Sequence, residues 1–200
     1  MVAWLQRTGR APAWRWIAPL LVTAVAGFLR FSRLHIPSGY VFDEVYYAKD
    51  AWNLLQHGVE LNAEGTGPGF VVHPPLGKWL IALGQAAFGN DEFGWRFSTA
   101  VAGTLAVLVV TRLAQRLTGS TLLGCLAGLV LALDGLAFVQ SRTSMLDIFL
   151  MLFVLAAFGC LVVDRDVTVK RAGVGTGGGT AAGGTADGGT AAGGTADGGT

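Results

Sequence analysis

The chain has 200 residues, of which 52% are hydrophobic and only 14% are charged, whereas a typical soluble domain carries roughly 25% charged residues. Its formal net charge of +1 gives no basic excess of the kind that a nucleic-acid partner requires. The apolar residues fall into long blocks, which predicts an all-α, multi-spanning integral membrane protein.

Four apolar blocks are long enough to cross a membrane as helices, since about 20 residues span the hydrocarbon core. They cover residues 14–31, 97–117, 120–138 and 145–163. We therefore predict a membrane domain over residues 14–163, preceded by a short tail of residues 1–13.

The basic residues give the expected orientation. If all four helices cross once, eight basic residues fall on one side, which the positive-inside rule makes cytoplasmic. They are Arg7, Arg10, Arg15, Arg112, Arg116, Arg165, Lys170 and Arg171. The N-terminal tail is then cytoplasmic, and the loop of residues 32–96 lies on the outer side.

This outer loop is rich in aromatic residues, so its composition is not that of a disordered linker. Residues 45–55 and 76–88 are predicted to form short helices, and the second is apolar but too short to span. We expect both helices to lie along the membrane surface.

From residue 164 onward the composition changes. Residues 181–190 read AAGGTADGGT, and residues 191–200 repeat that string. Such a segment cannot bury enough apolar surface to offset its chain entropy, so residues 164–200 are expected to form a flexible cytoplasmic tail. Because the sequence stops inside the repeat, we expect a truncated chain, with a natural insert as the alternative.

An acidic pair, Asp43-Glu44, stands in the outer loop within the string VFDEVYYAKD. A positioned carboxylate there can act as a general base or stabilise charge. Alternatively, Asp43 caps a helix and Glu44 interacts favourably with the helix dipole. Adjacent helical side chains point about 100° apart, so the two carboxylates cannot share one role.

The string HPPLGK at residues 73–78 is the second motif. Proline disfavours helix at the residue before it and suits the first helical position, so a helix should begin at Pro75. The free N–H groups of that first turn form an anion site. Lys78 lies in the same turn, where a cation opposes the helix dipole, and a bound anion between them would offset this penalty. The alternative is a tight turn with Lys78 reaching the lipid headgroups.

Charged residues also stand at the outer ends of the later spans. Arg96 follows a tryptophan, as interfacial anchors do. Arg142 and Asp147 flank the short link between the third and fourth spans, where Ser144 and Asp147 have the spacing of a capping box. Their functional alternative is a cation and a second carboxylate facing the first loop.

Two further observations concern acids and metals. Asp134 is a weaker functional candidate near the outer end of the third span, because acids inside a membrane are costly and often functional. No metal site is expected, since His35, His57 and His73 lack ligand spacing.

In chain order the motifs read FDEVYYAKDAW, HPPLGKWLIALG, FGWRFSTAVAGTL and VQSRTSMLDIFL. Over residues 14–165 this order resembles the protein O-mannosyltransferase family in its bacterial, actinobacterial-type form. The resemblance implies an inverting glycosyltransferase of the GT-C superfamily, in the plasma membrane. It would move mannose from polyprenyl phosphate mannose to Ser or Thr hydroxyls of secreted proteins. The family has more spans than are expected here, which implies an N-terminal fragment.

The resemblance also implies roles for individual residues. Asp43 is expected to take the proton of the acceptor hydroxyl, while Glu44 orients the acceptor or holds the helix. The leaving lipid phosphate gains negative charge in the transition state, which nearby cations would stabilise. The expected phosphate-binding residues are His73, Lys78, Arg96 and Arg142, and Asp147 is a second candidate acid.

No cofactor or metal is expected, because the lipid-linked sugar is itself the donor. The expected partners are polyprenyl phosphate mannose, secreted polypeptides and the lipid bilayer, with the protein translocation machinery as a further candidate and no nucleic acid. Two alternatives use the same residues: a GT-C enzyme that moves another lipid-phosphate-linked sugar to lipid or glycan, and an inactive membrane scaffold fragment.

Overall fold

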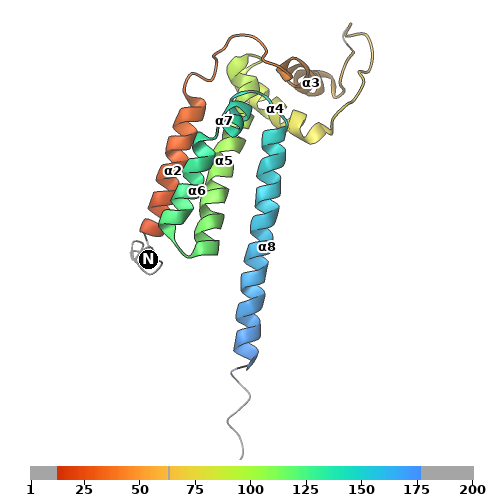
Figure 1. Ribbon diagram of the computed structural model, residues 1–200. Coiled ribbons are helices and arrows are strands. Elements are labelled where there is room, and N and C mark those ends of the chain that lie inside the picture. The colour runs from red at the N-terminus through yellow and green to blue at the C-terminus, as the bar shows by residue number, and fades with distance from the viewer. Residues whose placement is uncertain (1–12, 63, 177–200) are drawn as a thin grey trace, which may run out of the picture. The chain divides into compact units, whose positions relative to one another are not determined.

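The computed structural model describes residues 13–62 and 64–176, and within those ranges it contains seven helices and no strand (Figure 1). The predicted all-α class is confirmed. The chain forms two units, Met1–Val162 and Val163–Thr200, and all packing described below lies within the first. Most of the expected N-terminal tail, and the repeats of the expected C-terminal tail, lie outside the described residues.

Three helices are long and apolar enough to cross a membrane: α2 (Trp14–Phe31), α5 (Glu92–Thr118) and α8 (Asp147–Thr176), the last over Asp147–Val169. A fourth candidate is a bent pair, α6 (Thr121–Leu133) and α7 (Gly135–Arg142), whose axes differ by 62°. The chain is therefore a multi-pass membrane protein.

Two helix boundaries differ from expectation because aspartates supply caps. The third span bends at Asp134, whose Oδ2 accepts a hydrogen bond from the Ala137 amide at 2.8 Å and starts α7. In the same way Asp91 accepts from the Gly94 amide at 2.7 Å, so α5 begins at Glu92, five residues early.

At its other end α8 also departs from the expectation, since it continues to Thr176 and includes the first residues of the expected flexible tail. The sequence DRDVTVKRA that follows residue 163 contains no glycine or proline to end a helix, and the first glycine comes at position 173.

Helices α2, α5 and α6 lie side by side in Figure 1, and small residues allow α5 and α6 to approach closely. A Cβ atom on Gly124 of α6 would lie 2.7 Å from the Thr111 carbonyl oxygen and 2.7 Å from Gln115 Cβ on α5. A Cβ on Gly128 would collide with the Thr111 side chain. The contact therefore requires glycine at both positions.

The outer loop contains two helices, α3 (Glu44–His57) and α4 (Pro75–Phe88), close to the positions predicted from the sequence. Both pack on the first turns of α5 and α8 through a shared buried cluster. Its members are Tyr47, Ala48, Ala51, Ile81, Ala82, Trp95, Ala102, Met145, Ile148 and Phe149. Their position along a membrane surface stays a prediction.

The α5–α6 contact can be tested with paired glycine substitutions. We expect Gly124→Ala to lower the free energy of unfolding by about 1–3 kcal/mol, because the added methyl group overpacks the contact. Gly159→Ala in α8 is the control, since a Cβ there meets nothing within 4 Å, and alanine favours helix over glycine. Thermal unfolding in detergent measures both. Equal stability of the two variants would contradict the close α5–α6 contact.

Candidate functional site

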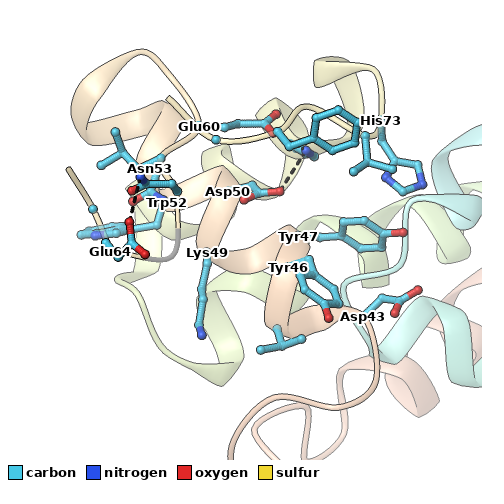
Figure 2. A pocket seen from close by; sticks show the side chains of 18 of the residues that line it. Asp43, Tyr46, Tyr47, Lys49, Asp50, Trp52, Asn53, Glu60, Glu64 and His73 are labelled. Carbon is cyan, nitrogen blue, oxygen red and sulfur yellow. Dashed lines mark hydrogen bonds and ion pairs between the residues drawn. The ribbon is translucent and has the colours of Figure 1, made fainter. Parts of the chain in front are cut away.

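A cleft of about 790 Å³ is lined by α3, α4 and the segment that joins them. This volume is within the range of small-molecule sites. Its charged and aromatic lining residues are Asp43, Asp50, Glu60, Glu64, Lys49, Lys78, Tyr46, Tyr47, Trp52, Phe70 and His73 (Figure 2).

The two carboxylates of the acidic pair have different surroundings. Glu44 is fully buried and accepts hydrogen bonds from Arg96 Nε and Nη2, each at 2.8 Å, from the Val41 amide at 2.8 Å and from the Ser144 amide at 2.9 Å. Asp43 is only half-buried and lines the cleft, and its side chain makes no capping hydrogen bond. Glu44 therefore holds the start of α3, while Asp43 faces the cleft.

Arg96 on α5 is also fully buried, and its N–H groups are occupied. Besides Glu44, it donates to the carbonyl oxygens of Leu34 at 3.1 Å, Pro37 at 2.8 Å and Gly39 at 2.9 Å. Five bonds use the five donors of a guanidinium. Arg96 is not among the cleft-lining residues, so the geometry leaves it no free donor for a phosphate.

The short link before α8 joins the same buried centre. The Ser144 hydroxyl donates to the Trp95 carbonyl oxygen, while its amide reaches Glu44. The Trp95 ring in turn stacks on Tyr40 with 4.8 Å between ring centroids. Four separate segments thus meet around one carboxylate–guanidinium pair.

Lys78, in the first turn of α4, lines the cleft but does not present a free ammonium. Its Nζ lies 2.9 Å from Asp50 Oδ2 and 2.7 Å from Glu60 Oε2, and its side chain is 1% exposed. A cation near a helix N-terminus is unfavourable without an anion nearby. Here the anions are two carboxylates of the chain itself.

Tyr47 lies beside Asp43 one turn along α3. Figure 2 shows Asp43, Tyr47 and His73 together at one end of the cleft. The Tyr47 and His73 rings meet edge to face, with 5.3 Å between centroids. Burial, and then the charges of Asp43 and Asp147, raise the pKa of Tyr47 above its ordinary value. The Tyr47 hydroxyl therefore stays neutral next to Asp43.

Two candidates from the sequence lie outside this cleft. Arg142 donates to the carbonyl oxygens of Leu29 at 3.2 Å and Arg33 at 3.0 Å, and its guanidinium lies 5.4 Å from the Phe138 ring centroid. Asp147 is exposed at the start of α8. The structure brings Asp43, His73 and Lys78 together, and it places Glu44, Arg96, Arg142 and Asp147 elsewhere.

Three cleft residues were missed from the sequence: Tyr47, Asp50 and Glu60. The spacing of Asp43, Tyr47 and Asp50 on a helix is a signal that could have found two of them, because residues four and seven apart share a face. Glu60 follows a turn at Gly58, with a φ of 75°, and carries no comparable local signal.

The buried pair can be tested through stability. Glu44→Gln should lower the free energy of unfolding by about 3–5 kcal/mol, because it leaves the Arg96 charge buried and uncompensated. Asp43→Asn removes the adjacent carboxylate and is expected to cost much less. Denaturant or thermal unfolding compares the two, and equal destabilisation would contradict the separate placement of these carboxylates.

Comparison with known proteins agrees with the motif order. Residues 72–175 match the family model described as dolichyl-phosphate-mannose-protein mannosyltransferase. The chain is 49% identical over 160 residues to the polyprenol-phosphate-mannose–protein mannosyltransferase of Mycolicibacterium smegmatis (strain ATCC 700084 / mc(2)155), covering 78% of the chain and 30% of that protein. Identity to the protein of the same name from Mycobacterium tuberculosis (strain ATCC 25618 / H37Rv) is 48%, with the same coverage.

A third relative of that name, from Corynebacterium glutamicum, is 38% identical over 169 residues, which are 81% of the chain and 32% of that protein. No solved structure gives a significant match. The chain thus spans about 30% of the length of the curated relatives it matches. The family model covers more than half of the chain, and the resemblance seen in the motifs is confirmed: the chain belongs to the dolichyl-phosphate-mannose-protein mannosyltransferase family.

Proposed function

We propose that the chain supplies the base and part of the phosphate site of an enzyme that moves mannose from polyprenyl phosphate mannose to Ser or Thr hydroxyls of secreted proteins. The observation that carries this proposal is the division of the acidic pair. Glu44 forms a buried ion pair with Arg96, whereas Asp43 faces the cleft and makes no ion pair with any described residue. A carboxylate in that position can accept a proton.

The proposed reaction is a single displacement. Asp43 takes the proton of the acceptor hydroxyl while that oxygen bonds to the anomeric carbon of the mannose. The bond from that carbon to the phosphate oxygen breaks, and the lipid phosphate leaves with the electron pair. One displacement inverts the anomeric centre and forms no covalent sugar–enzyme adduct. No metal or other cofactor takes part in this scheme.

Charge grows on the leaving phosphate, so nearby cations stabilise the transition state. Lys78 and His73 both line the cleft that contains Asp43, which supports them as phosphate ligands. The first turn of α4, which begins at Pro75, adds unpaired backbone N–H groups. Arg96 contributes by fixing the position of α3, and Arg142 and Asp147 receive no direct role in this step.

We further propose that the cleft lies on the outer face of the plasma membrane. At the opposite end of α5 from Arg96, the Arg112 guanidinium lies 3.6 Å from the Trp16 ring centroid and donates to the Arg15 carbonyl oxygen at 2.9 Å. This basic end is cytoplasmic by the positive-inside rule. The donor's lipid tail then lies in the bilayer, and the acceptor arrives as an exported polypeptide, with the translocation machinery as its proposed source.

The catalytic role of Asp43 can be tested in protein expressed from the complete reading frame that contains this chain. With polyprenyl phosphate mannose and a Ser/Thr-rich peptide, Asp43→Asn should lower kcat by about 10²–10⁴-fold, as expected for loss of a general base. Donor binding should persist. Glu64→Gln, at an exposed position of the same cleft, is the control. Undiminished transfer by Asp43→Asn would refute the assignment, and transfer only to lipid or glycan would refute the protein acceptor.

The raised pKa of Tyr47, caused first by burial and then by the charge of Asp43, predicts a pH effect. A raised folded-state pKa means that the stability contributed by neutral Tyr47 is complete below its ordinary pKa of about 10 and is lost as pH rises through the folded value. Tyr47→Phe should therefore lose less stability than the parent protein between pH 9 and pH 11, roughly the window around that value. Thermal unfolding across this window measures the difference, and parallel curves would contradict the raised pKa of Tyr47.

A further inference from the structure

The most unusual feature of the cleft is that its buried lysine, Lys78, is already neutralised. Lys78 is held between Asp50 and Glu60, and the three side chains are 1%, 24% and 5% exposed. The group as a whole carries one net negative charge. A phosphate that approached it unchanged would meet repulsion as well as attraction.

We infer that Glu60 occupies the place on Lys78 that the donor's phosphate takes, so that the donor binds by exchange with Glu60. This inference rests on the proposed function, which makes a lipid-linked phosphate the ligand of this site. A phosphodiester and a carboxylate each carry one negative charge. The exchange therefore leaves the charge next to Lys78 unchanged, and the ammonium is never buried without an anion.

Asp50 is fixed more firmly than Glu60. It lies in the middle of α3, where its neighbours Ala48 and Ala51 are fully buried in the cluster that joins α3, α4, α5 and α8. Moving Asp50 would require moving that helix. Asp50 is thus suited to keep the Lys78 ammonium in place while its other partner changes.

Glu60 belongs instead to a small hairpin, residues 60–62 and 64–69, which we call the strap. Its hydrogen bonds are local: the Gly69 amide donates to the Glu60 carbonyl oxygen at 2.6 Å, and the Asn62 amide to the Gly67 carbonyl oxygen at 2.9 Å. A Cβ on Gly69 would lie 2.8 Å from the Leu61 carbonyl oxygen, so the hairpin closes tightly on itself.

Because these bonds lie within the strap, it can shift as a unit without breaking them. Most of its described residues are exposed or half-exposed, and the Glu60–Lys78 ion pair ties it to α4. Segments with few buried contacts are the ones that open at low cost. Exchange at Lys78 would therefore release the strap from α4. Phe70, which follows the strap in sequence, lines this side of the cleft and is 91% exposed.

The test uses the complete protein reconstituted in nanodiscs. It compares two substitutions that each remove the charge of one carboxylate in contact with Lys78. The probe is polyprenyl phosphate, the product of the proposed transfer, whose binding needs no mannose transfer. As a monoester it carries at least the single negative charge of the donor's diester. Glu60→Gln should lower its Kd by about tenfold, because a neutral amide competes less well for the ammonium. Asp50→Asn should raise the Kd, because the ammonium loses its fixed partner. Unchanged or weaker binding by folded Glu60→Gln would overturn the inference.

A second measurement leaves Lys78, Asp50 and Glu60 unchanged and so does not depend on the folding of Glu60→Gln. Spin labels at Thr66→Cys on the strap and Ala87→Cys on α4 report the distance between the two elements. Cys125, Cys160 and every cysteine of the complete protein outside this chain are replaced by serine. Polyprenyl phosphate should lengthen or broaden that distance, and uncharged polyprenol should not. An unchanged distance at saturating polyprenyl phosphate would overturn the exchange. Neither measurement uses Asp43 or an acceptor, so the two proposals can fail separately. If the mannosyltransferase proposal alone is wrong, no mannose transfer is seen while both results for Glu60 are still as expected.

Discussion

The Glu44–Arg96 ion pair determines how α3, the start of α5 and the link before α8 are arranged. Both side chains are fully buried, and a charge buried in protein is tolerated only when it is paired and hydrogen-bonded. The pair, with Glu44 on α3 and Arg96 on α5, meets this condition with partners from the segment between α2 and α3 and from the link before α8. The pair thereby connects the segment between α2 and α5, residues 32–91, to the first turn of α5 and to the link before α8. Asp43 inherits its position from this pair, because it is bonded directly to Glu44.

Lys78 forms a second charged cluster with the opposite character. At Arg96 every donor is used by groups that belong to rigid segments or to the backbone. At Lys78 one of the two anionic partners lies on a hairpin with mainly local bonds, and the cluster borders the cleft. The first cluster therefore fixes geometry, and the second has the partner exchange that we infer for it at its more loosely held carboxylate.

The sequence predicted the helices well because their signals are local. Apolar blocks and the proline at position 75 mark α2 and the start of α4 without knowledge of distant contacts. Asp134 shows the limit of this reasoning. It was weighed as a functional acid within one span, but its side chain caps α7 and bends the pair by 62°. The cap and the bend depend on the conformation and hydrogen bonding of the Asp134 side chain, which hydropathy does not report.

Site residues were predicted less completely because their partners are distant in sequence. Arg96 was expected at the phosphate, yet Glu44, its main partner, lies 52 positions away and could not be matched to it from spacing. Lys78 was recognised as a cation that needs an anion near a helix start. The sequence suggested a bound ligand, and the structure supplies Asp50 and Glu60. Family resemblance named the reaction class but not these contacts.

The acidic pair shows how adjacent residues of similar chemistry take different roles. The 100° step of a helix separates the two side chains, and the surroundings then decide what each can do. Glu44 accepts four hydrogen bonds in a buried site, and a carboxylate so engaged has no capacity for an acceptor hydroxyl. Asp43, half-buried and next to Tyr47 and His73, keeps that capacity. Because Glu44 is held by its hydrogen bonds, the position of the neighbouring Asp43 is fixed as well. The base that we propose needs both a free carboxylate and a defined position, since serine is a weak nucleophile that must lose its proton at one place.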